Sequence, residues 1–403
     1  MSDTSTSMVT LAGTIASLVL AAGQFDNHLW RIICIFGGSK ILPVVYGDQA
    51  WYVQWLISLA VNAAIWWIPH LRTAYKRSGC VVITGADSGM GQATVLYLAE
   101  TNDNAANNGS YDKIFAAAFN AKQALEKLEE KIKDKSKMKY IQVIPLDATK
   151  DDSVKQAAAT VSTFLKEKSS FLSGVVCYHG IGYNGPLPYM PMSLYQTQMD
   201  VNYFGNIRMT QAFLPLLQST TNATTHFRRM IFTGTGGGPC TPCPSLLSAY
   251  MSSKFAGEAM AQCLKQELYM TQGDGPKIDV SVINPGFVKP TQLMADGIKL
   301  TEKMWKMCED QEGSSIAKDT YGKMMEHFQL YAELQPGTHV SEVSKAAEQA
   351  LTAHSPRSSY KVGIDSKLAP IVGMFPTGVR EWIARNGIYG VLSPAKTVPG
   401  YRV

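Results

Sequence analysis

The stretch CVVITGADSGMGQATVLYLAE, residues 80–100, constrains the fold of this 403-residue chain more than any other stretch. It begins with a short β-branched run at 81–83, continues as a glycine-rich turn at 84–91, and ends in a helical pattern at 92–100. A strand, a tight turn and a helix in this order bring backbone N–H groups and the positive end of the helix dipole to one point. The stretch therefore predicts the start of a nucleotide-binding α/β unit.

Three glycines give this turn its expected chemistry. Gly85 permits the tight turn, Gly89 lets the backbone approach a pyrophosphate, and Gly91 allows the helix to lie close to the strand. A glycine pattern alone is a weak signal, so the interpretation depends on its position after a buried strand and before a helix.

Further short apolar runs follow at the spacing of βα units. Their alternation with helical stretches is typical of a parallel sheet, so we predict an α/β fold with a doubly wound, Rossmann-like sheet. The expected strands are 113–118, 140–146, 174–178, 229–233 and 278–283, and the expected helices lie around 121–133, 153–166, 194–217 and 247–268.

Several candidate residues fall just past the ends of these strands. They are Asp147, Gly180, Thr235 and the pair Pro285–Gly286. Ligands of open α/β sheets bind beyond the carboxyl ends of the strands, so we expect these residues to surround one crevice.

A tyrosine and a lysine, Tyr250 and Lys254, stand one helical turn apart shortly after the glycine-rich stretch that holds Thr235. Many helices carry this pair on a solvated face, so the spacing alone indicates little. Their position near the expected crevice is what favours a proton-transfer site.

Over roughly residues 80–291 the chain resembles the short-chain dehydrogenase/reductase superfamily. Within it, the segments TGADSGMG, NYFGNIRMTQAFLPLL and YMSSKFAGEAM look most like the group of retinol dehydrogenases, 17β-hydroxysteroid dehydrogenase type 2 and D-3-hydroxybutyrate dehydrogenase. The motifs that match in the family's order are the glycine turn at 84–91, Asp147, Asn202 in DVNYFG, YMSSK at 250–254, and Pro285–Gly286.

The resemblance implies an NAD(P)-dependent oxidoreductase that interconverts an alcohol and a ketone or aldehyde by hydride transfer. Tyr250 would be the general acid/base, and Lys254 would tune it and hold the nicotinamide ribose. Thr235 would orient the substrate oxygen, and Asn202 would help a water to relay protons. A free phenol with a pKa of about 10 is a weak base near pH 7. A nearby ammonium and the positive oxidised nicotinamide both favour the phenolate, so we expect Lys254 and the bound cofactor to lower the pKa of Tyr250.

The resemblance also assigns cofactor-binding residues, and NAD is favoured over NADP. Ala118 and Phe119 stand where the family usually has an acid for NAD or an arginine for the 2′-phosphate of NADP, so neither rule applies. Asp87 in the glycine turn would repel that phosphate, and the similar-looking relatives use NAD. The expected cofactor residues are Thr84, Gly85, Asp87, Ser88, Gly89, Met90, Gly91, Asp147, Gly180, Tyr250, Lys254, Pro285 and Gly286.

Two departures from the family's pattern bear on activity. The family's NNAG is CYHG at 177–180, so only Gly180 is kept, and we expect local repacking with a packing role for His179. The family's catalytic serine is Thr235, which keeps a hydroxyl donor while its methyl group restricts χ1. A nucleotide-binding, non-catalytic sensor or scaffold therefore remains an alternative function.

The N-terminal region, residues 1–77, differs sharply in composition from the rest of the chain. Residues 4–25 and 49–71 contain no Asp, Glu, Lys or Arg, and about 20 apolar residues span a bilayer core. Aromatic residues flank 49–71 and basic residues follow it, which favours a membrane anchor with a cytosolic domain after it. This predicts an intracellular membrane, such as the endoplasmic reticulum. A buried hairpin is the alternative, and 4–25 is the weaker segment.

We expect a Rossmann-type catalytic domain at 78–290, and a substrate-covering segment with an apolar tail at 291–403. Methionines in the covering segment suit an irregular apolar ligand, so the expected substrate is a retinoid, a steroid or a related lipid. Ordinary helix core explains the same residues equally well. A 3-hydroxybutyrate-type hydroxy acid is the alternative substrate. The residues concerned are Met294, Met304, Trp305, Met307, Met324, Met325 and Phe328, with Lys289, Lys299 and Lys303 as candidates for an anionic substrate.

Composition argues against several other functions. The net charge of +5 is spread without a dense basic stripe, so nucleic acid is not an expected partner. Seven irregularly spaced cysteines argue against a disulfide framework. Cys240 and Cys243 lie among prolines, which favours a loop over a metal or redox site, and no metal is expected. A homodimer is considered as a further partner state.

Overall fold

The computed structural model describes most of the chain from residue 74 to residue 383. The described ranges are 74–103, 109–219, 227–236, 238–240, 243–271, 276–291, 305–307, 319–326, 328 and 337–383. Contacts divide the chain into two compact units, Met1–Ala74 with Ala353–Arg357, and Tyr75–Thr352 with Ser358–Val403. The expected membrane segments 4–25 and 49–71 lie outside the described residues. Within the described ranges, no helix combines the length and the apolar character needed to cross a bilayer.

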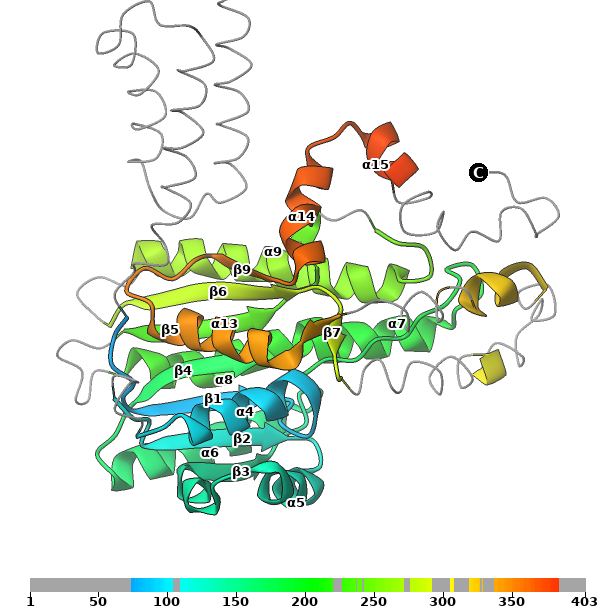
Figure 1. Cartoon of the computed structure of the whole chain (residues 1–403). Coiled ribbons are helices and arrows are strands. Elements are labelled where there is room, and N and C mark those ends of the chain that lie inside the picture. The colour runs from blue at the N-terminus through cyan, green and yellow to red at the C-terminus, as the bar shows by residue number, and fades with distance from the viewer. Residues whose placement is uncertain are drawn as a thin grey trace, which may run out of the picture. The chain divides into compact units, whose positions relative to one another are not determined.

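A single parallel sheet organises the larger unit (Figure 1). Its strand order is β3-β2-β1-β4-β5-β6-β9, so the chain moves outward from β1 to one edge and then crosses back. This confirms the predicted doubly wound α/β fold. The strands are β1 (Cys80–Thr84), β2 (Lys113–Ala118), β3 (Ile141–Pro145), β4 (Leu172–Cys177), β5 (Arg228–Thr233), β6 (Ile278–Pro285) and β9 (Ser359–Val362).

Most strand residues are apolar because helices cover both faces of the sheet. In β1 every residue is buried, and successive side chains point to opposite faces. Val82 joins one apolar cluster, while Val81 and Ile83 join the other.

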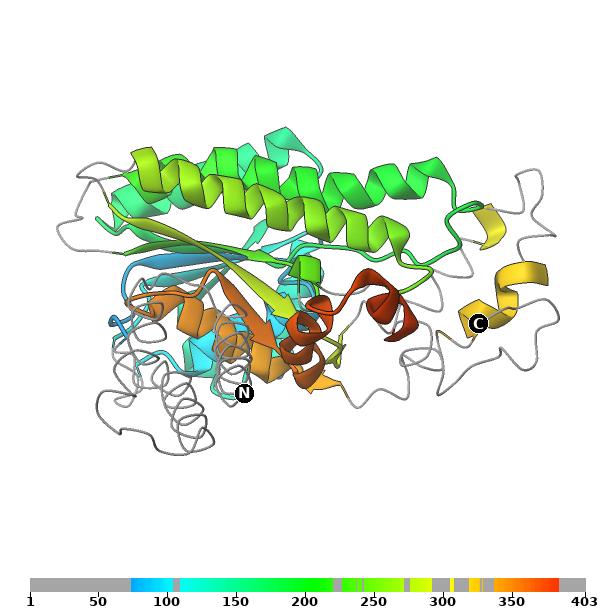
Figure 2. The same cartoon turned by 90° about the horizontal axis from the view of Figure 1, so that it is seen from above.

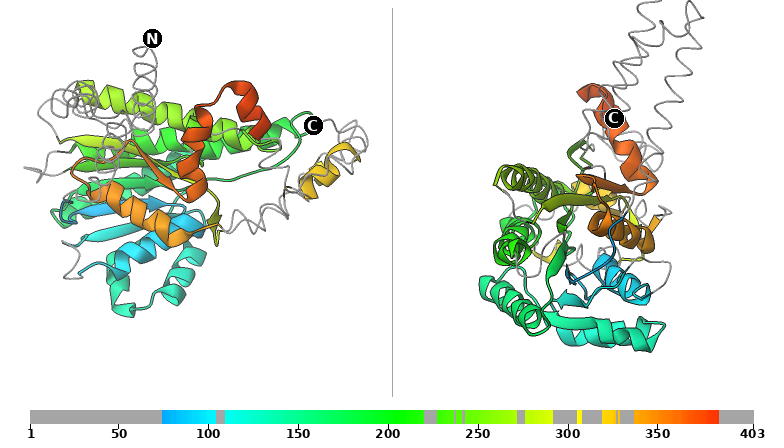
Figure 3. Two further views of the ribbon diagram at one scale, coloured as in Figure 1. Left: turned by 45° about the horizontal axis from the view of Figure 1, so that its top comes forward. Right: turned by 90° about the vertical axis from the view of Figure 1, so that its left-hand side faces the viewer.

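Two helical layers enclose the sheet (Figures 2 and 3). In Figure 2 the long green helices lie above the strands and the orange α13 lies below them. One layer consists of α4 (Gly89–Glu100), α5 (Ala121–Lys131) and α13 (Val340–Thr352), and the other of α6 (Asp151–Glu167), α8 (Gly205–Gln218) and α9 (Ser248–Thr271).

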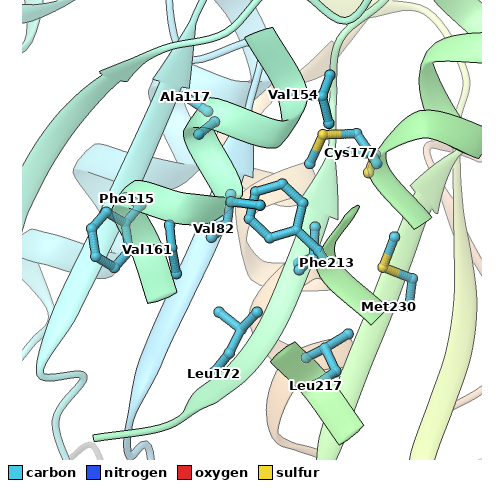
Figure 4. Close-up of a cluster of buried hydrophobic side chains, with 14 of the residues drawn as sticks. Val82, Phe115, Ala117, Val154, Val161, Leu172, Cys177, Phe213, Leu217 and Met230 are labelled. Atoms are coloured by element: carbon cyan, nitrogen blue, oxygen red, sulfur yellow. The ribbon is translucent and has the colours of Figure 1, made fainter. Parts of the chain in front are cut away.

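The core on the second face is continuous across neighbouring strands. Figure 4 shows Val82, Cys177 and Met230, from three adjacent strands, gathered around Phe213 of α8. All four are at most 1% exposed, so this packing fixes the strand ends that carry the site.

The sheet continues beyond the expected boundary at residue 290. β9 pairs in parallel with β6, and α13 packs on the face that also holds α4. The four-residue strand SYKV gives little periodicity, which is why it escaped sequence reasoning. The remaining elements are η2 (Lys135–Tyr140), α7 (Met192–Met199), η3 (Asp200–Phe204), η4 (Gly238–Cys240), β7 (Val288–Lys289), β8 (Thr338–His339), α14 (Ile364–Gly373) and α15 (Thr377–Ile383).

Candidate active site

The glycine turn after β1 has the geometry of a phosphate cradle. Gly85 has a φ of +64°, in the left-handed region that glycine tolerates. A Cβ on Gly91 would lie 2.2 Å from the carbonyl oxygen of Gly85, so the close approach of α4 to the turn requires glycine there. Ser88 is the N-cap residue of α4, and its side chain makes no capping hydrogen bond. First-turn N–H groups at such a helix end suit an external acceptor such as a phosphate, so these residues fit a dinucleotide.

The other residues of the turn anchor it to its surroundings. Gly89 begins α4 with a φ of +55°, and the partly buried Met90 packs against the apolar cluster shared by α4 and α13. Asp87 accepts N–H hydrogen bonds from Phe119 at 3.3 Å and from Asn120 at 3.0 Å. Its carboxylate therefore joins the glycine turn to the end of β2, where dinucleotide-binding sheets read the adenosine ribose.

A basic residue that the sequence did not reveal also reaches this turn. Lys127 of α5 donates a hydrogen bond from Nζ to the carbonyl oxygen of Asp87 at 3.5 Å. Lys127 is separated from Asp87 by 40 residues, so only the fold brings the two together.

Thr84 binds the segment after β4 through its hydroxyl group. Oγ1 accepts the N–H of Tyr178 at 3.0 Å and the N–H of His179 at 3.1 Å. With both lone pairs used, the hydroxyl hydrogen is left to donate to His179 Nδ1 at 2.8 Å. Burial, aided by the charge of Lys254, lowers the pKa of His179 to about 3. The imidazole is therefore neutral, which supports the expected packing role.

Asn202 lies in the π-helical turn η3, a kind of distortion that is frequent at functional sites. It exchanges two hydrogen bonds of 2.9 Å with the backbone of Ile181 and donates a third, also 2.9 Å, to Ser253 Oγ. A Cβ on Gly180 would lie 3.2 Å from Asn202 Oδ1 and 3.3 Å from Lys254 Nζ. The expected residues Asn202, Gly180 and Lys254 therefore come together at one point.

Lys254 is a buried cation with little compensation. It is 6% exposed, and Nζ donates to the carbonyl oxygen of Thr233 at 3.1 Å. Nζ lies 5.9 Å from the centroid of the Tyr250 ring. Burial lowers the pKa of Lys254 to about 8. The ammonium keeps two further N–H donors for a ligand.

Tyr250 and Thr235 meet through a side-chain hydrogen bond. Burial raises the pKa of Tyr250, and the hydrogen bond with Thr235 opposes that shift. The sequence led us to expect a lowered pKa through Lys254. In the protein alone burial dominates, because the Lys254 ammonium is itself desolvated and donates to a backbone carbonyl group.

Two further candidates lie at strand ends as expected. Oδ1 of Asp147 accepts from Thr149 N at 2.9 Å and from Thr149 Oγ1 at 2.7 Å. A residue of α14 fixes the Pro285–Gly286 turn. Asp365 Oδ2 accepts a hydrogen bond from the N–H of Phe287 at 2.7 Å. A Cβ on Gly286 would lie 1.9 Å from Asp365 Oδ1, so glycine is required there. Asp365 belongs to the site's framework, and nothing in the sequence pointed to it.

An apolar cluster lies around the start of α9, next to Tyr250. Its buried members are Met190, Leu194, Leu246, Ala249, Met325 and Phe328, with Trp305, Met307 and Met324 packed against them. The structure therefore places several residues of the expected substrate-covering segment beside the residues that precede Tyr250. Met294, Met304, Lys299 and Lys303 lie outside the described residues.

Comparison with known proteins agrees with this geometry. The family described as short chain dehydrogenase matches residues 79–299. A 3beta-hydroxysteroid dehydrogenase of Caenorhabditis elegans is 27% identical, over 77% of this chain and 74% of its own. Human retinol dehydrogenase 5 is 27% identical, over 81% of this chain and 90% of its own. The mitochondrial D-beta-hydroxybutyrate dehydrogenase of Bos taurus is 25% identical, over 70% of this chain and 76% of its own.

Solved structures show the same fold. A short chain dehydrogenase/reductase from Burkholderia phymatum, in complex with NAD, superposes with a TM-score of 0.55 at 17% identity. The match covers 73% of this chain and 92% of that one.

Proposed function

The chain belongs to the short-chain dehydrogenase family, and from that premise we propose that it is an NAD-dependent dehydrogenase of a lipophilic alcohol such as a retinoid, a steroid or a related lipid. It is an oxidoreductase that acts on CH–OH groups with a nicotinamide nucleotide. The observation that carries the proposal is the hydrogen-bonded pair Tyr250–Thr235, one helical turn from the buried Lys254.

In the proposed reaction, Tyr250 takes the hydroxyl proton of the alcohol, and Thr235 donates a hydrogen bond to the substrate oxygen. Bound NAD⁺ would supply the acceptor for the hydride of the carbinol carbon. The glycine turn and the N-terminus of α4 would hold its pyrophosphate, and Lys254 would bind the nicotinamide ribose through its remaining donors. The contacts of Asn202 with Ile181 and Ser253 support its role in fixing the segment next to Lys254.

The apolar cluster beside Tyr250 supports a lipophilic substrate. Met190, Leu246 and Met325 come from segments far apart in sequence, and their buried side chains offer apolar contacts. Thioethers adapt to irregular apolar shapes, which suits a polycyclic or polyene alcohol.

The carboxylate of Asp87 supports the preference for NAD, because it stands at the end of β2 where a 2′-phosphate would meet a like charge. Lys127 is the residue that opposes this preference. Steady-state kinetics with both nucleotides test the preference for NAD. NAD⁺ is expected to give a higher kcat/KM than NADP⁺, and Asp87→Asn is expected to bring the two kcat/KM values closer together. A higher kcat/KM with NADP⁺ would overturn this part of the proposal.

Contact with a membrane surface is also proposed. Ile364, Leu368 and Ile371 of α14 recur at i, i+4 and i+7 and are 76%, 50% and 46% exposed, whereas Ser366 and Ala369 are buried. An apolar stripe on the outward side of a helix suits the interface of a bilayer, and the apolar segment 49–71 supports the same partner. Ile371→Glu is expected to raise KM for a vesicle-dissolved alcohol but not for a water-soluble one. Lys367→Glu is the control, and equal changes in both KM values would refute the contact.

A second candidate is a hydroxy-acid dehydrogenase of the hydroxybutyrate type. The similarity to D-beta-hydroxybutyrate dehydrogenase favours it. Its activity would appear as turnover of 3-hydroxybutyrate in preference to retinol or estradiol.

The test is absorbance at 340 nm with NAD⁺ or NADP⁺ and a panel of retinol, estradiol and 3-hydroxybutyrate. We expect turnover of a lipophilic alcohol by the wild type and by Tyr269→Phe, a control on the exposed end of the same helix. Tyr250→Phe is expected to lose that turnover. Nucleotide binding without turnover of any alcohol or matching carbonyl compound would favour the non-catalytic sensor or scaffold.

A further inference from the structure

Thr235 lies in a glycine-rich turn whose backbone has little conformational preference of its own. The sequence there is GTGGG, residues 234–238. Gly238 has a φ of +66°, and its N–H donates to the carbonyl oxygen of Thr235 at 2.8 Å. Glycines lose more conformational freedom on ordering than other residues, so other parts of the protein must fix this turn.

Two buried polar side chains lie against both ends of the turn. Glu258 is 7% exposed and Asn284 is fully buried. A Cβ on Gly234 would lie 2.0 Å from Asn284 Oδ1 and 2.6 Å from Glu258 Oε2. A Cβ on Gly238 would lie 3.0 Å from Glu258 Oε1. Together these contacts bracket Thr235.

The two side chains are tied to each other and to the framework. Asn284 Nδ2 donates to Glu258 Oε1 at 3.1 Å and to Ser359 Oγ of β9 at 3.0 Å. The carbonyl oxygen of Asn284 accepts from Ser366 Oγ of α14 at 2.6 Å. The turn therefore rests on β6, β9 and α9 at once.

Glu258 also shares its helix with the reacting residues. Tyr250, Lys254 and Glu258 follow at i, i+4 and i+8 of α9, so they lie along one side of the helix. Burial raises the pKa of Glu258, while the hydrogen bond with Asn284 and the charge of Lys361 oppose the shift.

The remaining oxygens of the two side chains are also informative. Glu258 Oε2 and Asn284 Oδ1 are buried and have no hydrogen-bond partner within the described part of the chain. A buried polar group without a partner lowers stability, so its presence calls for an explanation. Here both lie against the turn that carries Thr235, which points to a role in placing that turn.

We propose that Glu258 and Asn284 are positioning residues that set the place of the Thr235 hydroxyl and thereby the orientation of the substrate oxygen. The inference rests on the proposed function of Thr235. It predicts that removal of the Glu258 carboxyl group acts on turnover through Thr235 and not through NAD binding.

A double-mutant cycle on the full chain tests it, with Glu258→Ala and Thr235→Ala, alone and combined. A misplacement of about 1 Å costs on the order of 10²-fold in rate, so Glu258→Ala is expected to lower kcat by roughly 10- to 100-fold. The KM for NAD⁺ should stay within about twofold, since the glycine turn after β1 is untouched. In the Thr235→Ala background the same change should lower the residual kcat no further.

Glu258→Gln is the conservative control, because its amide keeps the shape of the side chain and one of the two oxygens. We expect it to recover kcat to within roughly threefold of the wild type. Where Glu258→Ala does not fold, the cycle is repeated with Asn284→Ala. An equal loss of kcat in both backgrounds, or no loss in the wild-type background, would overturn the inference. Full activity of Tyr250→Phe would instead refute the proposed function itself.

Discussion

Two buried basic side chains stand at opposite ends of the sheet. Arg229, near the start of β5, is fully buried and pairs with Asp279 through Nη1 at 2.9 Å. Its guanidinium also donates to the carbonyl oxygens of Ala350 at 3.1 Å and of Arg228 at 3.0 Å. Lys254 lies beyond the carboxyl end of β5, and among the described residues its ammonium donates to one acceptor, the carbonyl oxygen of Thr233.

The difference separates a charge that is paired within the framework from the charge that the proposed function assigns to ligand binding. Burial lowers the pKa of both side chains, but the charge of Asp279 opposes the shift for Arg229. Within the part of the chain that the structure describes, no carboxylate opposes the shift for Lys254, and its pKa falls to about 8. A buried cation without a carboxylate partner at the carboxyl edge of the sheet can bind a ligand that enters there. Its burial lowers the free energy of unfolding.

The largest effect is expected for Lys254→Met. General acid/base catalysis contributes roughly 10²- to 10⁴-fold, so we expect kcat/KM for the alcohol to fall by that factor. The free energy of unfolding at pH 7 should not fall, because the variant removes a buried charge that costs about 3 kcal/mol. Turnover at 340 nm and urea unfolding measure the two quantities. A Lys254→Met protein with a lower free energy of unfolding than the wild type would contradict the statement that the buried Lys254 charge is uncompensated.

Arg229→Met tests the other end of the sheet. Removing one partner of a buried ion pair costs about 3–5 kcal/mol, since Asp279 is left without its counter-charge. The folded fraction is expected to keep the wild-type kcat, because Arg229 lies far from the strand ends that carry the site. Unfolding by urea and activity per folded molecule check both statements. An Arg229→Met protein with unchanged stability and reduced kcat would contradict the structural role of Arg229.

The pH dependence of stability sharpens the comparison further. The pKa of Lys254 is about 8 in the folded protein and near its usual 10.5 in the unfolded chain. Between these values the unfolded chain binds more protons, so this residue makes the free energy of unfolding rise with pH over this window. In Lys254→Met the free energy of unfolding should rise less with pH over this window. Parallel slopes for the wild type and the variant from pH 7 to pH 10 would contradict the uncompensated burial.

The smallest effect is expected for Thr235→Ser. The hydroxyl donor is retained and only a methyl group is lost, so kcat should change by less than about tenfold. Thr235→Ala is the matched control and is expected to lose much more activity. Equal activity of the two variants would remove Thr235 from the proposed mechanism.

Sequence reasoning reached the fold and the strand-end residues because both depend on short-range patterns. The run KIFAAA predicted β2 to the residue, and the glycine turn predicted a helix over 92–100, which in the structure begins three residues earlier, at Gly89. Glu258, Asp365 and Lys127 were missed because their contacts with the site cross 20 or more positions, which local patterns do not reveal. The pKa of Tyr250 in the protein without nucleotide is raised by burial, which spacing on a helix does not reveal.

The most direct test of the central claim is a single turnover of NAD⁺-saturated enzyme mixed with the best alcohol of the panel. We predict reduced nicotinamide at 340 nm with the wild type, and a rate lower by roughly 10²- to 10⁴-fold with Tyr250→Phe at unchanged NAD⁺ affinity. Hydride transfer by Tyr250→Phe at the wild-type rate would contradict the account.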